Sequence, residues 1–186
     1  MPFPEVHPFT YRLLKERYDQ LGKHTRENRW KFRGTYSPLL WYGGGHPTLD
    51  RQQQRHHIDF KVSFELLRLG LLVWVNDRSA TQLMAIPFQD IKALEIHFES
   101  AHAMPEKESL FDRLIKWGIK PTHCAWLAKS REYEPAMVHL HLLLHDSVLL
   151  FWSQGEDYNG IVRYFSKPIF SLLFPVKVFK SAEHTD

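Results

Sequence analysis

The sequence predicts an α+β domain built on a bent antiparallel β-sheet or barrel, with an N-terminal helix, an inserted helix and a C-terminal capping helix. Apolar and polar residues alternate with period two along residues 60–98 and 124–152, which is typical of half-buried strands. Three other segments (11–21, 105–117 and 157–167) repeat apolar residues every three or four positions, as amphipathic helices do. The strands follow one another through short turns, which favours an antiparallel meander.

Composition predicts a single globular domain. The chain has 186 residues, of which 44% are hydrophobic, 24% charged and 14% aromatic, and this excludes collagen-like and disordered classes. We expect one domain over 1–186, made of an N-terminal helical extension (1–28), a core (29–167) that carries the helix insertion (105–117), and an apolar tail (168–186). At this length the core needs neither a metal nor a disulfide.

The N-terminal sequence and the cysteine content predict a cytoplasmic protein. Cys124 is the single cysteine, so no intramolecular disulfide can form. The first residues, MPFPEVHPF, show neither a basic region nor an apolar run of a secretory signal. No run of about 18 apolar residues is long enough to span a bilayer.

The N-terminal part predicts a helix, a strand and a loop. Thr10 is a good N-cap, Phe9 can pack on Leu14, and Gly22 is the natural end of the helix. Around residues 30–36, aromatic residues alternate with basic ones, which predicts a half-buried strand. Residues 42–54 are predicted to form a loop, because the glycines and a proline sustain neither period.

The middle of the chain predicts four strands. Residues 60–66 alternate so that Phe60, Val62, Phe64 and Leu66 share one face, with the other face wet. Gly70 marks a break, and two further strands, 71–75 and 81–86, are joined by the turn sequence Asn-Asp-Arg-Ser. Pro87 ends the third strand. A fourth follows over 93–98.

The C-terminal part predicts two helices and three strands. Pro105 opens the inserted helix, whose apolar residues end at Trp117. Strands are expected at 124–129, 137–144 and 148–152, the last two forming a hairpin through His145-Asp146-Ser147. Asp157 is expected to cap the final helix, whose apolar stripe is Ile161, Tyr164 and Phe165.

The sequence MAIPFQDIKALEI carries a family resemblance. It places an Ile-Pro-aromatic step (86–91) between two strands, and with the final hairpin and helix it resembles the pleckstrin-homology-like domain, in its bacterial and GRAM-type forms. The resemblance covers residues 58–167. It implies a domain that binds phosphoinositides, peptides or proteins and is not an enzyme. The N-terminal helix, the inserted helix and the apolar tail depart from the minimal pattern of that family.

Histidines in the sequence HLHLLLHD are candidate metal ligands. His139 and His141 would share one face of a strand, which is how a His-x-His pair chelates zinc or iron. A third ligand could come from His145 or Asp146 in the turn, or from His97 or His123 on a neighbouring strand. The alternative, which we favour, is that the leucines of this strand face the core and the histidines are ordinary outer-face residues. We therefore predict no metal and no cofactor.

Three further features are better explained by structure than by chemistry. Cys124 and His123 would point to opposite faces of a strand, which disfavours a nucleophile–base pair and predicts a core cysteine. His56 and His57 end a polar segment. The sequence GGGHPT (43–48) offers backbone amides to a phosphate, but no Walker lysine follows.

A basic segment is the main candidate for partner or lipid binding. Arg29, Lys31 and Arg33 alternate with Trp30 and Phe32, so the same strand could contact phosphates or simply be amphipathic. Residues 12–33 carry a net charge of +5 and residues 86–112 a net charge of −4. The tail, 167–180, could touch a membrane surface or dock on the domain's own sheet.

The sequence therefore predicts a non-enzymatic binding module that recognises a protein partner, in a regulatory, adaptor or toxin-neutralising immunity role, without nucleic acid. Arg29, Lys31, Arg33 and Trp30 are the expected binding residues. One alternative is a peripheral module that binds anionic lipid. Another is a metal-dependent enzyme that uses the His139–His141 pair.

Overall fold

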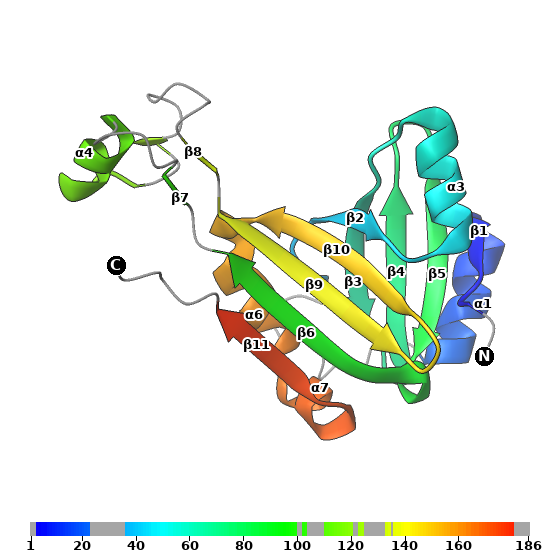
Figure 1. Cartoon of the computed structure of the whole chain (residues 1–186). Helices are drawn as coiled ribbons and strands as arrows, with labels where there is room; N and C mark the ends of the chain where they lie inside the picture. Colours follow the sequence, from blue (N-terminus) through cyan, green and yellow to red (C-terminus); the bar gives the residue numbers. More distant parts are fainter. Residues whose placement is uncertain are drawn as a thin grey trace.

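A computed structural model describes residues 3–22, 36–99, 102–103, 110–120, 123–124, 133–134 and 136–180. Its main feature is a nine-stranded sheet (Figure 1), in the order β1-β5-β4-β3-β2-β10-β9-β6-β11. The strands are β1 (Val6–Pro8), β2 (Leu40–Gly44), β3 (Lys61–Leu66), β4 (Gly70–Asn76), β5 (Thr81–Pro87), β6 (Ile91–Glu99), β9 (Met137–Leu144), β10 (Val148–Gln154) and β11 (Val176–Lys180).

Helices and a second, two-stranded sheet complete the described structure. The helices are α1 (Tyr11–Leu21), α3 (Pro47–His56), α4 (Leu110–Lys116), α6 (Tyr158–Phe165) and α7 (Pro168–Leu173), with short 3-10 turns η1 (Phe88–Asp90) and η2 (Gly155–Asp157). Strands β7 (His102–Ala103) and β8 (Tyr133–Glu134) pair with each other and lie, with α4, beyond the ends of β6 and β9 (Figure 1). The predicted α+β class is confirmed.

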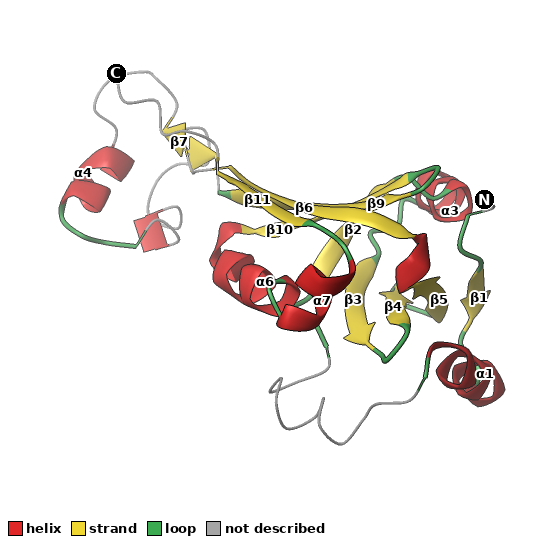
Figure 2. Ribbon diagram, turned by 90° about the horizontal axis from the view of Figure 1, so that it is seen from below, coloured by secondary structure: helices red, strands yellow, loops and turns green. Residues whose placement is uncertain are grey.

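The sheet is bent and open. Every strand pair is antiparallel except β11 with β6, which is parallel. Helices α6 and α7 lie under the layer formed by β6, β9, β10 and β11, with β3, β4 and β5 turning down beside them (Figure 2). A closed barrel, which the sequence allowed, is not formed. Instead, the free edge of β5 pairs with the N-terminal strand β1, and the free edge of β6 pairs with the C-terminal strand β11. Strands β5 and β6, which follow each other in sequence, therefore do not pair with each other.

The main core lies between the sheet and its two C-terminal helices. Phe64 contacts Phe151 and Phe165 edge-on, with ring centroids 5.0 and 5.5 Å apart. The Tyr164 hydroxyl donates a hydrogen bond to the Phe64 carbonyl at 2.9 Å, which ties α6 to β3. Phe170 is fully buried in the same core, so the apolar tail docks on the domain itself. The apolar stripe predicted for the final helix is confirmed.

Helix α1 covers the opposite side of β3, β4 and β5. The Thr10 side chain accepts a hydrogen bond from the Leu13 amide at 3.1 Å, and Gly22 ends the helix with φ 77°, as predicted. A second apolar cluster forms beneath α1 from Leu21, Leu67, Leu72, Leu83 and Ala85. The prediction of a wet face on residues 60–66 is therefore wrong at Glu65, which is fully buried.

The predicted loop over 42–54 is also wrong, because this segment contains the end of β2 and most of α3. His46 acts as the N-cap by accepting from the Thr48 amide at 3.3 Å, and Pro47 occupies the first helical turn, where its missing N–H costs nothing. Gly45 would place a Cβ 1.9 Å from the Val148 carbonyl oxygen. The glycines thus allow close approach of β2 to β10 and do not provide flexibility.

Other predicted elements are shifted, or lie partly outside the described residues. His123 and Cys124 lie in a helical turn and not in a strand, since the Cys124 amide donates to the Lys120 carbonyl at 3.0 Å. Asp157 precedes α6 without capping it; its carboxylate accepts from the Ser153 hydroxyl at 2.5 Å. The predicted strand near residue 30 lies outside the described residues. The start of the inserted helix does so too, and the described part of that helix is α4.

Candidate binding face with a histidine cluster

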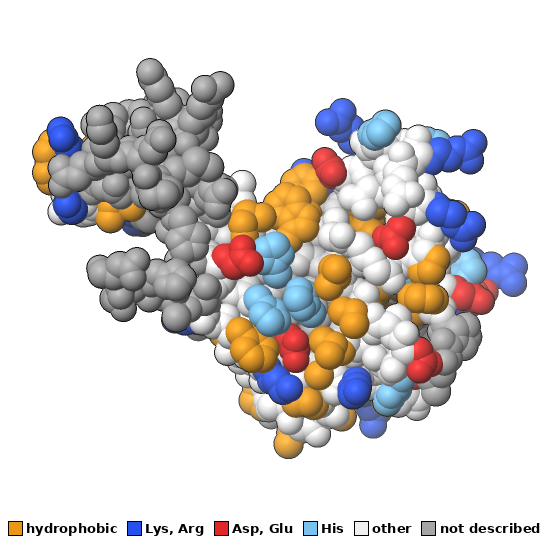
Figure 3. Space-filling model, in the orientation of Figure 1, with side chains coloured by type: hydrophobic (Ala, Val, Ile, Leu, Met, Phe, Trp, Pro, Cys, Tyr) orange, Lys and Arg blue, Asp and Glu red, His pale blue; other side chains and the backbone are white. Residues whose placement is uncertain are grey.

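Part of the sheet has a face that no helix of the described segments covers (Figure 1 and Figure 2). We call it the outer face: the side of β2, β10, β9, β6 and β11 that points away from α6 and α7. Because side chains alternate along a strand, the core takes Val138, Leu140 and Leu142 of β9, and the outer face takes the residues between them. Figure 3 shows this face, where a group of histidine side chains lies among hydrophobic and charged ones.

An aromatic row crosses the outer face from one strand to the next. The register aligns Phe179 of β11, His97 of β6, His139 of β9, Trp152 of β10 and Trp41 of β2. Phe179 stacks on His97 with ring centroids 4.6 Å apart, and Trp152 stacks on Trp41 at 5.7 Å. The ammonium of Lys61 lies 5.1 Å from the Trp41 ring centroid. The row is a continuous, half-exposed aromatic surface.

A second row runs beside the first and carries charges. It aligns Lys177, Glu95, His141 and Leu150 on the same four strands β11, β6, β9 and β10. The Lys177 ammonium lies 3.7 Å from Glu95 Oε1. Leu150 is 37% exposed and Phe179, in the aromatic row, is 42% exposed. We call this second set the polar row.

Where the two rows meet, three potential metal-ligand side chains converge. One ligand atom from each of Glu95, His97 and His141 lies within 4.8 Å of the others, and we call these residues the triad. The His97 and His141 rings are 4.6 Å apart between centroids. His97 Nε2 has almost no accessible surface and makes no hydrogen bond, although Glu95 Oε2 lies 3.5 Å away. The two side chains are therefore within ion-pair distance without a hydrogen bond between these atoms.

The surroundings disfavour the protonated form of His141. Partial burial, together with the neighbouring His97 and His139, lowers the pKa of His141 below its ordinary value, and Glu95 opposes this only in part. A positive charge on a half-buried imidazole beside two others is unfavourable. A neutral imidazole keeps a ring-nitrogen lone pair available to a metal at neutral pH.

The sequence-predicted ligands separate in the structure. His139 and His141 do share the outer face, as predicted, but His139 lies 3.6 Å from Glu99 and is not one of the triad. His145, in the β9–β10 turn, hydrogen-bonds the Gln89 carbonyl at 3.0 Å, and Asp146 is exposed in the same turn. Neither of them joins the triad, nor does His123.

His97 was among the ligands predicted from the sequence, but Glu95 was not. The signal was present, because Glu95 and His97 are two positions apart on β6 and must share a face. The missing information was the pairing of β6 with β9, which sets Glu95 opposite His141 across a long insertion. Alternation fixes which residues share a face of one strand, but not which strand lies beside it.

Two cavities lie near the ends of the sheet. One, of about 450 Å³, opens beside the Trp41 end of the aromatic row and is lined by Trp41, His56, His57, Ile58, Asp59, Lys61, Asn76, Asp77, Arg78 and Ser79. His56 and His57 thus line a pocket at the end of α3. The pocket extends the outer face into a concave site.

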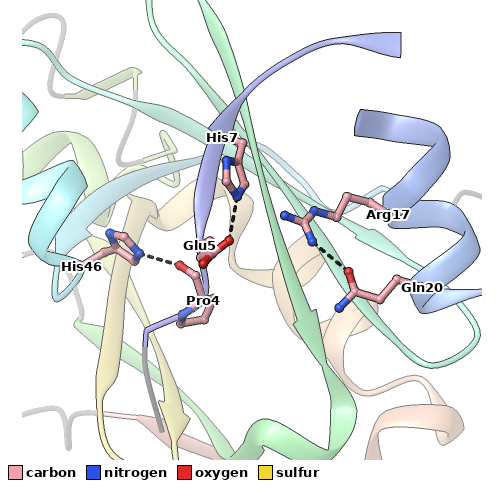
Figure 4. Close-up of polar contacts among 6 residues, drawn as sticks. All are labelled: Pro4, Glu5, His7, Arg17, Gln20 and His46. Atoms are coloured by element: carbon pink, nitrogen blue, oxygen red, sulfur yellow. Dashed lines mark hydrogen bonds and ion pairs between the residues drawn. The ribbon is translucent and has the colours of Figure 1, made fainter. Parts of the chain in front are cut away.

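The other cavity, of about 260 Å³, lies between the N-terminal segment, α1 and the β9–β10 turn. Figure 4 shows its polar lining: Glu5 and Pro4 come from the N-terminal segment and Arg17 and Gln20 from α1. Arg17 donates to Gln20 at 2.9 Å, and His46 Nε2 lies 2.7 Å from the Pro4 carbonyl (Figure 4). The first contact lies within α1, and the second ties the N-terminal segment to the start of α3.

The remaining candidates add no chemistry within the described part of the chain. Cys124 is fully buried, with its sulfur 3.4 Å from the Ile119 carbonyl, so the core reading of this cysteine is confirmed. Arg29, Trp30, Lys31 and Arg33 lie outside the described residues. None of the helices in the described segments is both long and apolar enough to cross a membrane.

No family model matches the chain, and neither does any curated protein or solved structure. Its function is therefore inferred from its own residues.

Proposed function

We propose that this protein is a non-enzymatic binding module that recognises a protein partner through the outer face. The observation that carries the proposal is the aromatic row, in which the half-buried Trp41 and Trp152 stack on each other at one end. Phe179 lies exposed at the other end, beyond His139 and His97. Protein interfaces are enriched in aromatic side chains at their centre and have a polar rim. A continuous exposed apolar patch on a folded domain is itself a marker of an interaction site.

The charges of the outer face favour a protein over an anionic polymer or membrane. Glu95 and Glu99 are balanced there by Lys61 and Lys177. Phosphate-rich partners require a cationic excess, because their affinity comes largely from phosphate contacts. Two of the large apolar residues of the tail, Phe170 and Phe174, are buried in the core and so are not available to a membrane, although Leu172 and Leu173 remain exposed.

We propose further that the fold is a decorated pleckstrin-homology-like domain. Two features support this: strands β2 to β5 form a first meander, and the step over 86–91 leads through η1 into β6. The β9–β10 hairpin and α6 then follow in the expected order. The regulatory, adaptor and immunity roles are all compatible with such a module.

Site-specific cross-linking tests the partner proposal. A photo-reactive amino acid at Leu150, on the outer face, should form a protein adduct in lysate of the source cell, and the same group at Leu172 should not. Leu172 is the matched control because it is 83% exposed but lies on α7, away from the outer face.

Trp152→Ala in the Leu150-labelled protein should reduce the adduct by about tenfold or more, as truncation of a central interface aromatic does. Equal adducts from both positions, or an adduct unchanged by Trp152→Ala, would contradict the proposal.

A further inference from the structure

The outer face contains a polar arrangement that partner recognition does not explain. His97 Nε2 is enclosed and makes no hydrogen bond, while a carboxylate oxygen and a second imidazole lie beside it. A buried polar atom without a hydrogen bond costs about 1–3 kcal/mol, so such atoms are rare unless something else satisfies them.

We infer that Glu95, His97 and His141 together bind one divalent transition-metal ion. Two imidazole nitrogens and one carboxylate oxygen are a donor set that suits zinc. In a tetrahedral site with bonds of about 2.0–2.1 Å, neighbouring ligand atoms are about 3.3 Å apart. The 3.5 Å separation of His97 Nε2 from Glu95 Oε2 is already close to this value, and a ring nitrogen of His141 lies within 4.8 Å of a ligand atom of each.

Neighbouring side chains hold the ligands in place. Lys177 approaches the outer oxygen of Glu95, Oε1, at 3.7 Å, which leaves Oε2 directed toward His97. Phe179 stacks on the His97 ring with planes 15° apart and limits its rotation. Such supporting contacts orient ligands before the ion arrives, which lowers the entropic cost of binding.

The site would remain open on one side. The triad supplies three ligands from two adjacent strands, and its side chains are half-exposed on the outer face. A fourth position therefore points toward solvent, as in zinc sites that keep water or another exchangeable ligand. Metal binding in this position requires no partner, so the inference stands apart from the proposed function.

Direct zinc titration tests the inference. The untagged full-length chain, stripped with chelator, is titrated with zinc against a chromophoric competitor, and metal content is measured after removal of free ion. We expect one zinc per chain. Cobalt(II) should bind in the same place and give the intense visible bands of a four-coordinate ion, which report ligand geometry independently of affinity.

Isosteric variants identify the ligands. Glu95→Gln, His97→Gln and His141→Gln should each weaken zinc binding by at least about 100-fold, more than the 10–100-fold typical of a supporting residue. His139→Gln is the matched control: it lies on the same face and in the same strand as His141, outside the triad. Its zinc affinity should stay within about threefold of the wild type. Unfolding curves confirm that each variant is folded.

Three outcomes would overturn the inference. They are substoichiometric zinc in the folded wild type, triad variants that bind zinc like the wild type, and an effect of His139→Gln as large as that of His141→Gln. Loss of cross-linking to a partner with zinc binding intact would refute the proposed function alone.

Discussion

Glu65 provides the most direct test of how the N-terminal helix is attached to the sheet. Its carboxylate is fully buried, yet it accepts from Tyr18 at 3.0 Å and from the Trp74 indole at 2.8 Å. Tyr36 also hydrogen-bonds to it. These donors come from α1, β4 and the segment before β2, so the carboxylate joins three parts of the chain around one buried charge.

Replacing Glu65 by Ala leaves those donors facing a cavity. Each unsatisfied donor costs about 1–3 kcal/mol, and water can reach Tyr18 and Trp74 in part because both are only half-buried. We expect Glu65→Ala to lower the free energy of unfolding by about 3 kcal/mol, because the donors lose their acceptor and the truncated side chain leaves a cavity. Glu65→Gln retains one acceptor and should cost about half as much.

Urea unfolding followed by tryptophan fluorescence measures the effect. Ser63→Ala is the matched control, since Ser63 lies two residues away on the same strand and face; it should change stability by less than about 0.5 kcal/mol. If Glu65→Ala stays within about 1 kcal/mol of the wild type, or costs no more than Ser63→Ala, the carboxylate does not hold α1 to the sheet, and this reasoning is refuted.

Three further predictions follow from other contacts. Burial raises the pKa of Tyr164 well above 10.0, so the unfolded tyrosine loses its proton first as pH rises through 10. Tyr164 should therefore contribute a fall in stability of about 1.4 kcal/mol per pH unit there, in addition to the contributions of Tyr18, Tyr36 and Tyr42, whose pKa values are also raised. Tyr164→Phe should reduce the slope in alkaline urea titrations by that amount, and an unchanged slope would contradict the assignment. Gly45→Ala, at φ 99° with a Cβ clash on β10, should destabilise by at least about 2 kcal/mol more than Gly118→Ala, at φ 79° in open space; equal costs in urea unfolding would contradict the clash. Zinc at 100 times its Kd should raise the unfolding free energy of the wild type by about 2.7 kcal/mol, but not that of His97→Gln, and a wild type unaffected by zinc would argue against the triad.

Local patterns predicted the parts of the fold that depend on local physics. The β9–β10 hairpin, the cap at Thr10 and the buried stripe of α6 each follow from residues within a few positions of one another. Helix α3 escaped prediction because its N-cap is His46, which is not a preferred capping residue, and its helical residues are polar. The cap works here because the imidazole is also held by the Pro4 carbonyl, a contact between distant segments.

The parts that failed depend on which strands meet. Glu65 was expected in water because alternation alone cannot show that α1 will cover that face. The triad likewise needs β6 beside β9, and the aromatic row needs five strands in register. The period-two alternation of β9 correctly placed His139 and His141 outside the core. The side chains that converge with His141, however, lie on the neighbouring strand β6.

The C-terminal tail connects the core to the outer face. Phe170 and Phe174 bury themselves under the sheet, and this fixes where the chain emerges to form β11. From there, parallel pairing with β6 sets Lys177 beside Glu95 and Phe179 beside His97. The same segment therefore closes the core with its first half and supports the triad with its second. A tail that served only to cover apolar surface would have no need to end in a strand whose outward residues contact Glu95 and His97.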